Sequence, residues 1–107
     1  ELQQNINELL LQLHFEKVYR VIFGSQIGLL QYLINRGEQG LSNFEIGELY
    51  KHNPISSTYP LENYIGFLLN NRLIQLNSIS ATYTITPVGR LFLDYLTTNQ
   101  IPPIRPN

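Results

Sequence analysis

The chain offers few side chains that could perform chemistry. His14 and His52 are its only histidines and lie on separate segments, and there is no cysteine. Neither histidine has a second ligand at a spacing typical of a metal site, and zinc-thiolate, iron–sulfur and thiol-nucleophile sites are excluded without cysteine. Glu45 and Glu48 lie three residues apart, but Glu45 is better explained as a helix-capping residue. We therefore expect no enzyme, no catalytic residue, and no bound metal or cofactor.

The segment Gly24-Ser25-Gln26-Ile27-Gly28 does not fit a nucleotide-binding loop. A phosphate-binding loop follows a strand and, in its commonest form, contains a lysine, and this segment has neither. Two glycines four residues apart on a helix are more simply explained by close packing.

Composition limits the class of protein. The chain has 107 residues, of which 43% are hydrophobic and 14% are charged, with a formal net charge of −1. This length suits one domain with an added arm. No apolar run is long enough to span a membrane and no signal-peptide pattern opens the chain, so we expect a cytoplasmic protein without membrane contact. The chain contains no methionine, so we expect a processed chain or part of a longer one.

The N-terminal segment, from residue 1 to about Ile22, is predicted to be a helix because its apolar residues recur at helical spacing. One row steps by four, three and four residues, as in a short coiled coil, and is predicted to mediate homodimerisation: Leu2, Ile6, Leu9 and Leu13. A second row is expected to pack on the domain: Leu11, Phe15, Val18 and Ile22. The alternative is a helix that packs wholly on its own domain.

Two shorter helices are expected next. Ser25 is predicted to cap a helix that ends at Gly37, and Ser42 with Glu45 forms a capping box that opens a helix to about His52. Their expected inward residues are Ile27, Leu30, Leu33 and Ile34 in the first, and Phe44, Ile46, Leu49 and Tyr50 in the second. Pro54 ends the second helix, and residues 55–59 are expected to form a loop.

A further helix from Pro60 to about Asn71 is predicted to be amphipathic. Its buried row is Leu61, Ile65, Leu68 and Leu69, and its outer residues are Glu62, Asn63, Gly66, Phe67 and Asn70. Residues 73–76 and 82–85 alternate around a polar centre and predict a β-hairpin. Thr86-Pro87 then starts a last helix, whose apolar face is Val88, Leu91, Phe92, Tyr95 and Leu96.

The predicted fold class is therefore mainly α with a small two-stranded β-hairpin, an α+β arrangement. Residues 1–24 form an N-terminal helix and dimerisation arm, residues 25–98 form the domain, and residues 99–107 form an extended, proline-rich tail that includes Ile101–Pro106.

This order of elements resembles a winged helix-turn-helix domain of bacterial and archaeal transcription regulators, over about residues 26–97. The segment Tyr83-Thr84-Ile85-Thr86-Pro87-Val88-Gly89-Arg90 resembles the recurring Tyr-x-Leu-Thr-Pro-x-Gly-Arg exit from the wing in that family. Leu61, Ile65 and Leu68, followed by Leu73-Ile74, resemble its third helix and first wing strand. The segment from Leu41 to Leu49 resembles its second helix, in which a small residue such as Gly47 permits close crossing.

The resemblance implies that the third helix enters the major groove of double-stranded DNA. The candidate contact residues carried over from it are Ser57, Thr58, Tyr59, Glu62, Asn63, Phe67, Asn70 and Arg72. Asn63 could pair with an adenine edge, and Glu62 could accept from a cytosine amino group. Ser57 and Thr58 could donate to phosphates.

The sequence departs from a typical DNA-binding surface in its charge. From Pro54 to Thr86 the only Lys or Arg is Arg72, and it is balanced by Glu62. DNA affinity comes largely from neutralised phosphates, so a single domain would bind weakly. Two hypotheses stay open: a homodimeric DNA-binding regulator, or a protein-interaction module that uses Tyr59, Phe67 and the uncharged wing. Phe67 itself could contact a thymine methyl group, contact a protein partner, or pack beneath the hairpin as core.

Overall fold

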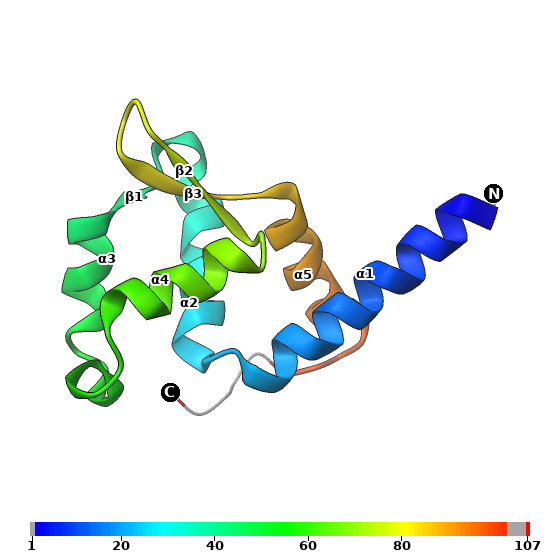
Figure 1. Ribbon diagram of the computed structural model, residues 1–107, viewed down its shortest axis with the longest axis horizontal. Helices are drawn as coiled ribbons and strands as arrows, with labels where there is room; N and C mark the ends of the chain where they lie inside the picture. Colours follow the sequence, from blue (N-terminus) through cyan, green and yellow to red (C-terminus); the bar gives the residue numbers. More distant parts are fainter. Residues whose placement is uncertain (1, 103–106) are drawn as a thin grey trace.

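The computed structural model describes the backbone of residues 2–102 and 107, and the side chains of residues 7–102 and 107. Within this part of the chain there are five α-helices, two short 3₁₀ helices and three strands (Figure 1). The α-helices are α1 (Leu2–Val21), α2 (Gly24–Arg36), α3 (Asn43–Tyr50), α4 (Leu61–Asn70) and α5 (Pro87–Thr98). The 3₁₀ helices are η1 (Gly37–Gln39) and η2 (Pro54–Ser57), and the strands are β1 (Leu41–Ser42), β2 (Ile74–Asn77) and β3 (Thr82–Ile85).

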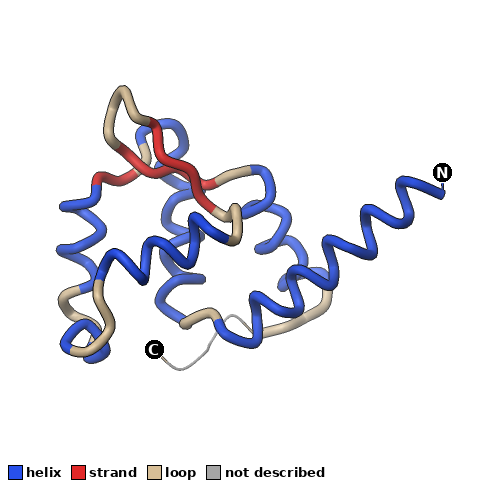
Figure 2. The backbone as a smooth tube through the Cα atoms, viewed as in Figure 1, coloured by secondary structure: helices blue, strands red, loops and turns tan. Residues whose placement is uncertain are grey.

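The sheet has three antiparallel strands in the order β1-β3-β2 (Figure 2). The prediction that the sheet consists of two strands was therefore wrong, because one strand was missed. The hairpin itself is confirmed, with Ile74 opposite Ile85. Leu41 lies opposite Tyr83 in the added strand. β1 was missed because two residues are too short to show alternation. The one residue that could have indicated β1 was Gly40, just before it. Its φ is +61°, and a Cβ atom there would overlap the carbonyl oxygen of Tyr83.

The core lies where α2, α4 and α5 meet the inner face of the sheet, and the C-terminal half of α1 covers one side of it. The rows predicted for α2 and for the inner face of α1 are largely confirmed. The most deeply buried aliphatic and phenylalanine side chains are Phe15, Val18, Ile22, Ile27, Leu30, Leu33, Leu41, Ile46, Ile65, Leu68, Leu73, Ile74, Phe92 and Leu96. Aromatic edges join α1 to α5, since the ring centroids of Phe15 and Phe92 lie 5.4 Å apart.

Several local predictions were wrong. Phe44 and Leu49 were expected to point inward, but they are 74% and 52% exposed. α3 is only eight residues long, so a single row, Ile46 and Tyr50, meets the core while the other apolar residues face outward. In α5, Leu91 is exposed, whereas Leu93 is buried.

The start of α2 also differs from the prediction. The helix begins at Gly24, so Ser25 lies inside its first turn and does not cap it. The N–H of Phe23 donates to Oε1 of Gln26 at 2.9 Å, which satisfies the backbone one residue before the helix. η2 replaces part of the loop expected at residues 55–59.

The junction between the hairpin and α5 explains the Thr-Pro-x-Gly run. Thr86 Oγ1 accepts from the N–H of Gly89 at 2.9 Å and donates to the carbonyl oxygen of Arg72 at 2.5 Å. Pro87 occupies the first position of α5, where no N–H is needed. A Cβ atom at Gly89 would overlap the carbonyl oxygen of Leu73, so only glycine lets α5 approach the base of the hairpin this closely.

The N-terminal end of the chain lies outside the main body, whereas the described C-terminal residues contact it. Figure 1 shows the N-terminal half of α1 projecting away from the other elements. On this half Leu9 and Leu13 are 60% and 53% exposed, while the side chains of Leu2 and Ile6 lie outside the described residues. Of the predicted tail, residues 103–106 also lie outside them, and the Tyr19 hydroxyl donates to the carbonyl of Pro102 at 3.0 Å. Among the described helices, none combines the length and apolar character needed to cross a membrane.

Candidate nucleic-acid interface

Hydrogen bonds fix α3 and the connection that joins it to α4. At the start of α3, Ser42 Oγ accepts from the N–H of Glu45 at 3.1 Å, and Glu45 Oε1 accepts from the N–H of Ser42 at 2.9 Å, which confirms the predicted capping box. After α3, Asn53 Oδ1 accepts from the N–H of Ile55 at 3.1 Å and starts η2. The Tyr50 hydroxyl donates to the carbonyl of Tyr59 at 2.7 Å. The connection is therefore tied back to α3 just before α4 begins.

The inner side of α4 is fixed to α2. Tyr64, Ile65 and Leu68 are buried, and Nε2 of the buried Gln26 donates to the carbonyl of Tyr64 at 2.9 Å. Apart from tyrosines, Gln26 is the one polar side chain that is buried among the described residues, and this bond gives its amide nitrogen a partner. The sequence pattern predicted neither a buried nor an outer position for Tyr64, and the structure shows that it is buried beside Ile65.

The outer side of α4 carries polar side chains that reach solvent. Glu62, Asn63 and Asn70 are exposed, and no side-chain hydrogen bond or ion pair involves them within the described part of the chain. Gly66 lies between them along the helix, and a Cβ atom there would have no neighbour within 4 Å. These groups are therefore free to bond to another molecule.

The other predicted contact residues are differently placed. Ser57 Oγ donates to the carbonyl of Pro54 at 3.1 Å, and Thr58 Oγ1 donates to that of Ile55 at 3.4 Å, so both hydroxyls bond within their own turn. Tyr59 packs edge-to-face on Phe23, with ring centroids 5.3 Å apart.

Phe67 was expected on the outer side of α4, but it is partly buried against the core. Of the alternatives left open for this ring, the packed position is the one that the structure shows. The eight predicted residues therefore do not form a single surface, and the exposed polar group on α4 is the part that stands free.

Few positive charges lie near this surface. Arg72 is exposed just beyond the C-terminal end of α4, where its φ is +63°. Lys51, at the end of α3, pairs with Glu48 at 2.7 Å in a solvent-exposed bridge. Exposed bridges of this kind contribute only about 0 to 1 kcal/mol, so Lys51 can readily exchange Glu48 for another anion.

The hairpin tip is uncharged. Ile79 at the tip is 97% exposed, and Leu76 is half exposed on the strand below it. The outer face of the sheet is polar: Gln75 Nε2 donates to Thr84 Oγ1 at 3.4 Å across the β2–β3 pair. The tip therefore offers apolar contact and hydrogen bonds, without ionic contact.

Shifted pKa values arise here from structural hydrogen bonds and burial. The hydrogen bond from the Ser42 backbone lowers the pKa of Glu45, which keeps the capping carboxylate ionised. Burial raises the pKa of Tyr64 to about 12, and burial also raises the pKa of Tyr50. In the described residues, no three His, Cys, Asp or Glu side chains gather where they could hold a metal ion.

The comparisons with known proteins do not identify a family for this chain. No family model matches the chain, and neither a curated protein nor a solved structure is significantly similar to it.

Proposed function

We propose that this chain is a winged helix-turn-helix domain that recognises double-stranded DNA through the outer side of α4. The observation that carries the proposal is the free polar row on that helix, Glu62, Asn63 and Asn70. α4 follows α3 through a braced turn and is followed directly by the β2–β3 hairpin, which is the order of elements in such domains.

The chemistry of this row suits direct readout of base edges. An asparagine amide can bond in two places to an adenine edge, and a glutamate can accept from a cytosine amino group. Asn63 and Glu62 supply these groups from the first turns of α4, which is the part of a recognition helix that contacts bases. Gly66 leaves the middle of the helix free of a side chain, so the groove floor can approach it closely.

Because the domain offers few positive charges to DNA phosphates, the proposal includes dimerisation. Arg72 follows the C-terminal end of α4 and Lys51 follows that of α3, and with one phosphate for each, one domain neutralises about two phosphates. The exposed row on α1, which includes Leu9 and Leu13, can pair with a second copy and double these contacts over two half-sites. The substitution pair Leu9→Ser and Leu13→Ser should then shift the chain from dimer to monomer in light scattering, with its circular dichroism spectrum retained.

A titration of a random-sequence duplex by fluorescence anisotropy tests the charge argument. Between about 20 and 200 mM salt, the logarithm of the association constant should fall linearly with that of the salt concentration, with a slope of about −4 for the dimer. Arg72→Ala should reduce the slope by about 2 units, one for each protomer. A duplex that shows no binding at the lowest salt concentration contradicts the proposal.

A protein partner is the second candidate, and the uncharged hairpin favours it. Phe44, Leu76 and Ile79 are exposed apolar side chains on α3 and the hairpin, and such residues are enriched at protein interfaces. If this candidate holds, Ile79→Ser abolishes binding to the partner, while DNA binding is absent in the unmodified chain.

A further inference from the structure

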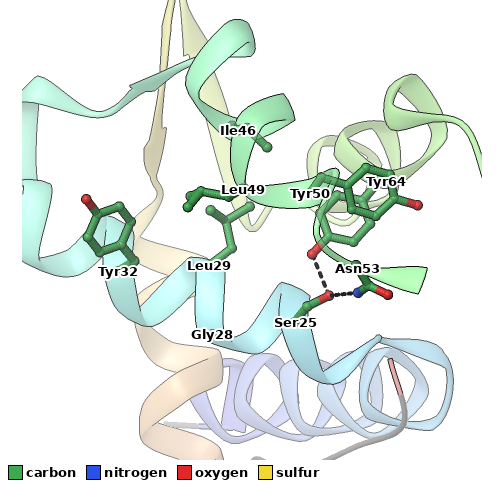
Figure 3. Close-up of a pocket in the computed structure, with 9 residues that line it drawn as sticks. All are labelled: Ser25, Gly28, Leu29, Tyr32, Ile46, Leu49, Tyr50, Asn53 and Tyr64. Carbon is green, nitrogen blue, oxygen red and sulfur yellow. Dashed lines mark hydrogen bonds between the residues drawn. The ribbon is translucent and has the colours of Figure 1, made fainter. Parts of the chain in front are cut away.

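A pocket of about 280 Å³ lies between α2, α3 and α4, on a different part of the domain from the outer side of α4. Its lining includes the buried side chains of Leu29, Ile46 and Tyr50 and the exposed side chains of Tyr32 and Leu49 (Figure 3). Its volume lies just below the roughly 300 to 1,000 Å³ range of ligand pockets. The walls are mostly apolar, so an apolar molecule would gain free energy by entering.

One corner of the pocket is polar. Ser25 of α2, Asn53 of the α3–α4 connection and Tyr64 of α4 converge there, as Figure 3 shows. Ser25 Oγ lies 2.6 Å from the Tyr64 hydroxyl oxygen, and Asn53 Nδ2 donates to Ser25 Oγ at 3.1 Å. Three elements therefore hold these groups in fixed positions.

Two groups of this corner already donate to one backbone oxygen. Ser25 Oγ donates to the backbone oxygen of Asn107 at 2.6 Å, and Asn53 Nδ2 donates to the same oxygen at 2.9 Å. Because Ser25 has one hydroxyl hydrogen and gives it to Asn107, the Tyr64 hydroxyl must be the donor in its bond to Ser25. The corner thus presents two donors to one acceptor atom.

The corner favours a neutral acceptor over a charged one. Among the described residues that line the pocket, none is Lys, Arg or His. A carboxylate that entered would lose its hydration without gaining an opposite charge, whereas an amide, ester or ketone carbonyl needs only the two hydrogen bonds. The Tyr64 phenol is protonated at neutral pH, as any tyrosine is, and burial raises its pKa to about 12, so it can support Ser25 in alkaline solution as well.

Gly28 keeps one wall of the pocket open. It lies in the interior of α2, where alanine would stabilise the helix by about 1 kcal/mol, and a Cβ atom there would have no neighbour within 4 Å. Because Gly28 lines the pocket and its Cβ position is open, we expect a larger side chain here to occupy part of the pocket.

We propose that this pocket binds a small, uncharged, mostly apolar ligand whose carbonyl oxygen bonds to Ser25 and Asn53 in place of the backbone oxygen of Asn107. The apolar body of the ligand lies between Leu29, Ile46 and Leu49. The proposal does not depend on DNA recognition by α4.

A titration of N-phenylacetamide into the isotope-labelled full chain tests the proposal by backbone amide NMR shifts. Saturable shifts should centre on Gly28, Leu49 and Asn53, with a dissociation constant on the order of 1 mM for so small a probe. Benzoate, of similar size but charged, should bind at least about tenfold more weakly. Ser25→Ala should weaken N-phenylacetamide about three- to tenfold and leave ethylbenzene, which lacks an acceptor, unchanged.

Gly28→Leu and Gly66→Leu form a matched pair, because each adds the same side chain to open space on a helix. Gly28→Leu should abolish the saturable shifts, and Gly66→Leu, on the outer side of α4, should retain them. The proposal is overturned if N-phenylacetamide gives no saturable shifts at about tenfold its expected dissociation constant. Equal binding to Gly28→Leu and the unmodified chain, or equal binding of benzoate, overturns it as well.

Discussion

Two regions of the molecule use glycine in opposite ways. At the base of the sheet, Gly40 and Gly89 have no room for a side chain, since a Cβ atom would overlap the carbonyl oxygens of Tyr83 and Leu73. On the open surfaces of α2 and α4, Gly28 and Gly66 have no neighbour within 4 Å. The first pair is required by the fold. The second pair weakens its helices without improving any contact, so it leaves space where another molecule can approach.

The largest expected effect lies in the closed region. Gly89→Ala forces α5 away from the base of the hairpin, and it should lower the free energy of unfolding by about 2 to 4 kcal/mol in urea titrations. Gly66→Ala is the control and should raise that free energy by about 0.5 to 1 kcal/mol. Equal effects of the two substitutions would remove the distinction between the regions.

High pH offers a second probe of the interior, through Tyr64. Its pKa is about 12 in the folded chain and near 10 in the unfolded chain, so the unfolded state loses the proton first. The stabilisation is complete below pH 10 and is lost as the pH rises from 10 towards 12. At a pH of about 11.5 the loss should be about 2 kcal/mol relative to pH 8. Tyr64→Phe should lack this part of the loss, and a parallel decline in both proteins would contradict the assignment.

A smaller effect is expected where α3 begins. Ser42→Ala removes the oxygen that accepts from the N–H of Glu45, and it should cost about 1 kcal/mol of unfolding free energy. Ser42→Asp keeps an acceptor at this position and should retain most of the stability. The reverse order of the two variants would show that β1 pairing, rather than capping, sets the requirement at Ser42.

The parts of the fold that the sequence could predict are those that depend on residues close together in the chain. Helical rows such as Ile27, Leu30 and Leu33 were readable because burial repeats at helical spacing. The capping box at Ser42 and the cap at Thr86 were readable because each bond joins residues three apart. β1 was not, because its pairing with β3 spans some 40 residues and only two residues take part.

The candidate sites were less predictable than the elements. The outer position of Asn63 followed from the period of α4, whereas the packing of Tyr59 on Phe23 depends on a contact between distant segments. The pocket corner joins Ser25, Asn53 and Tyr64, from separate elements, and no local pattern connects them. Such a corner becomes visible only when the helices are placed.

Selection of bound sequences from a random duplex pool tests most directly whether the outer side of α4 reads DNA. The unmodified chain should enrich one sequence motif, and Asn63→Ala should relax the preference at one base position of each half-site. Gly66→Leu should abolish enrichment, while Gly28→Leu should leave it intact. A pool that shows no motif with the unmodified chain, or the same motif with Gly66→Leu, would contradict recognition by α4.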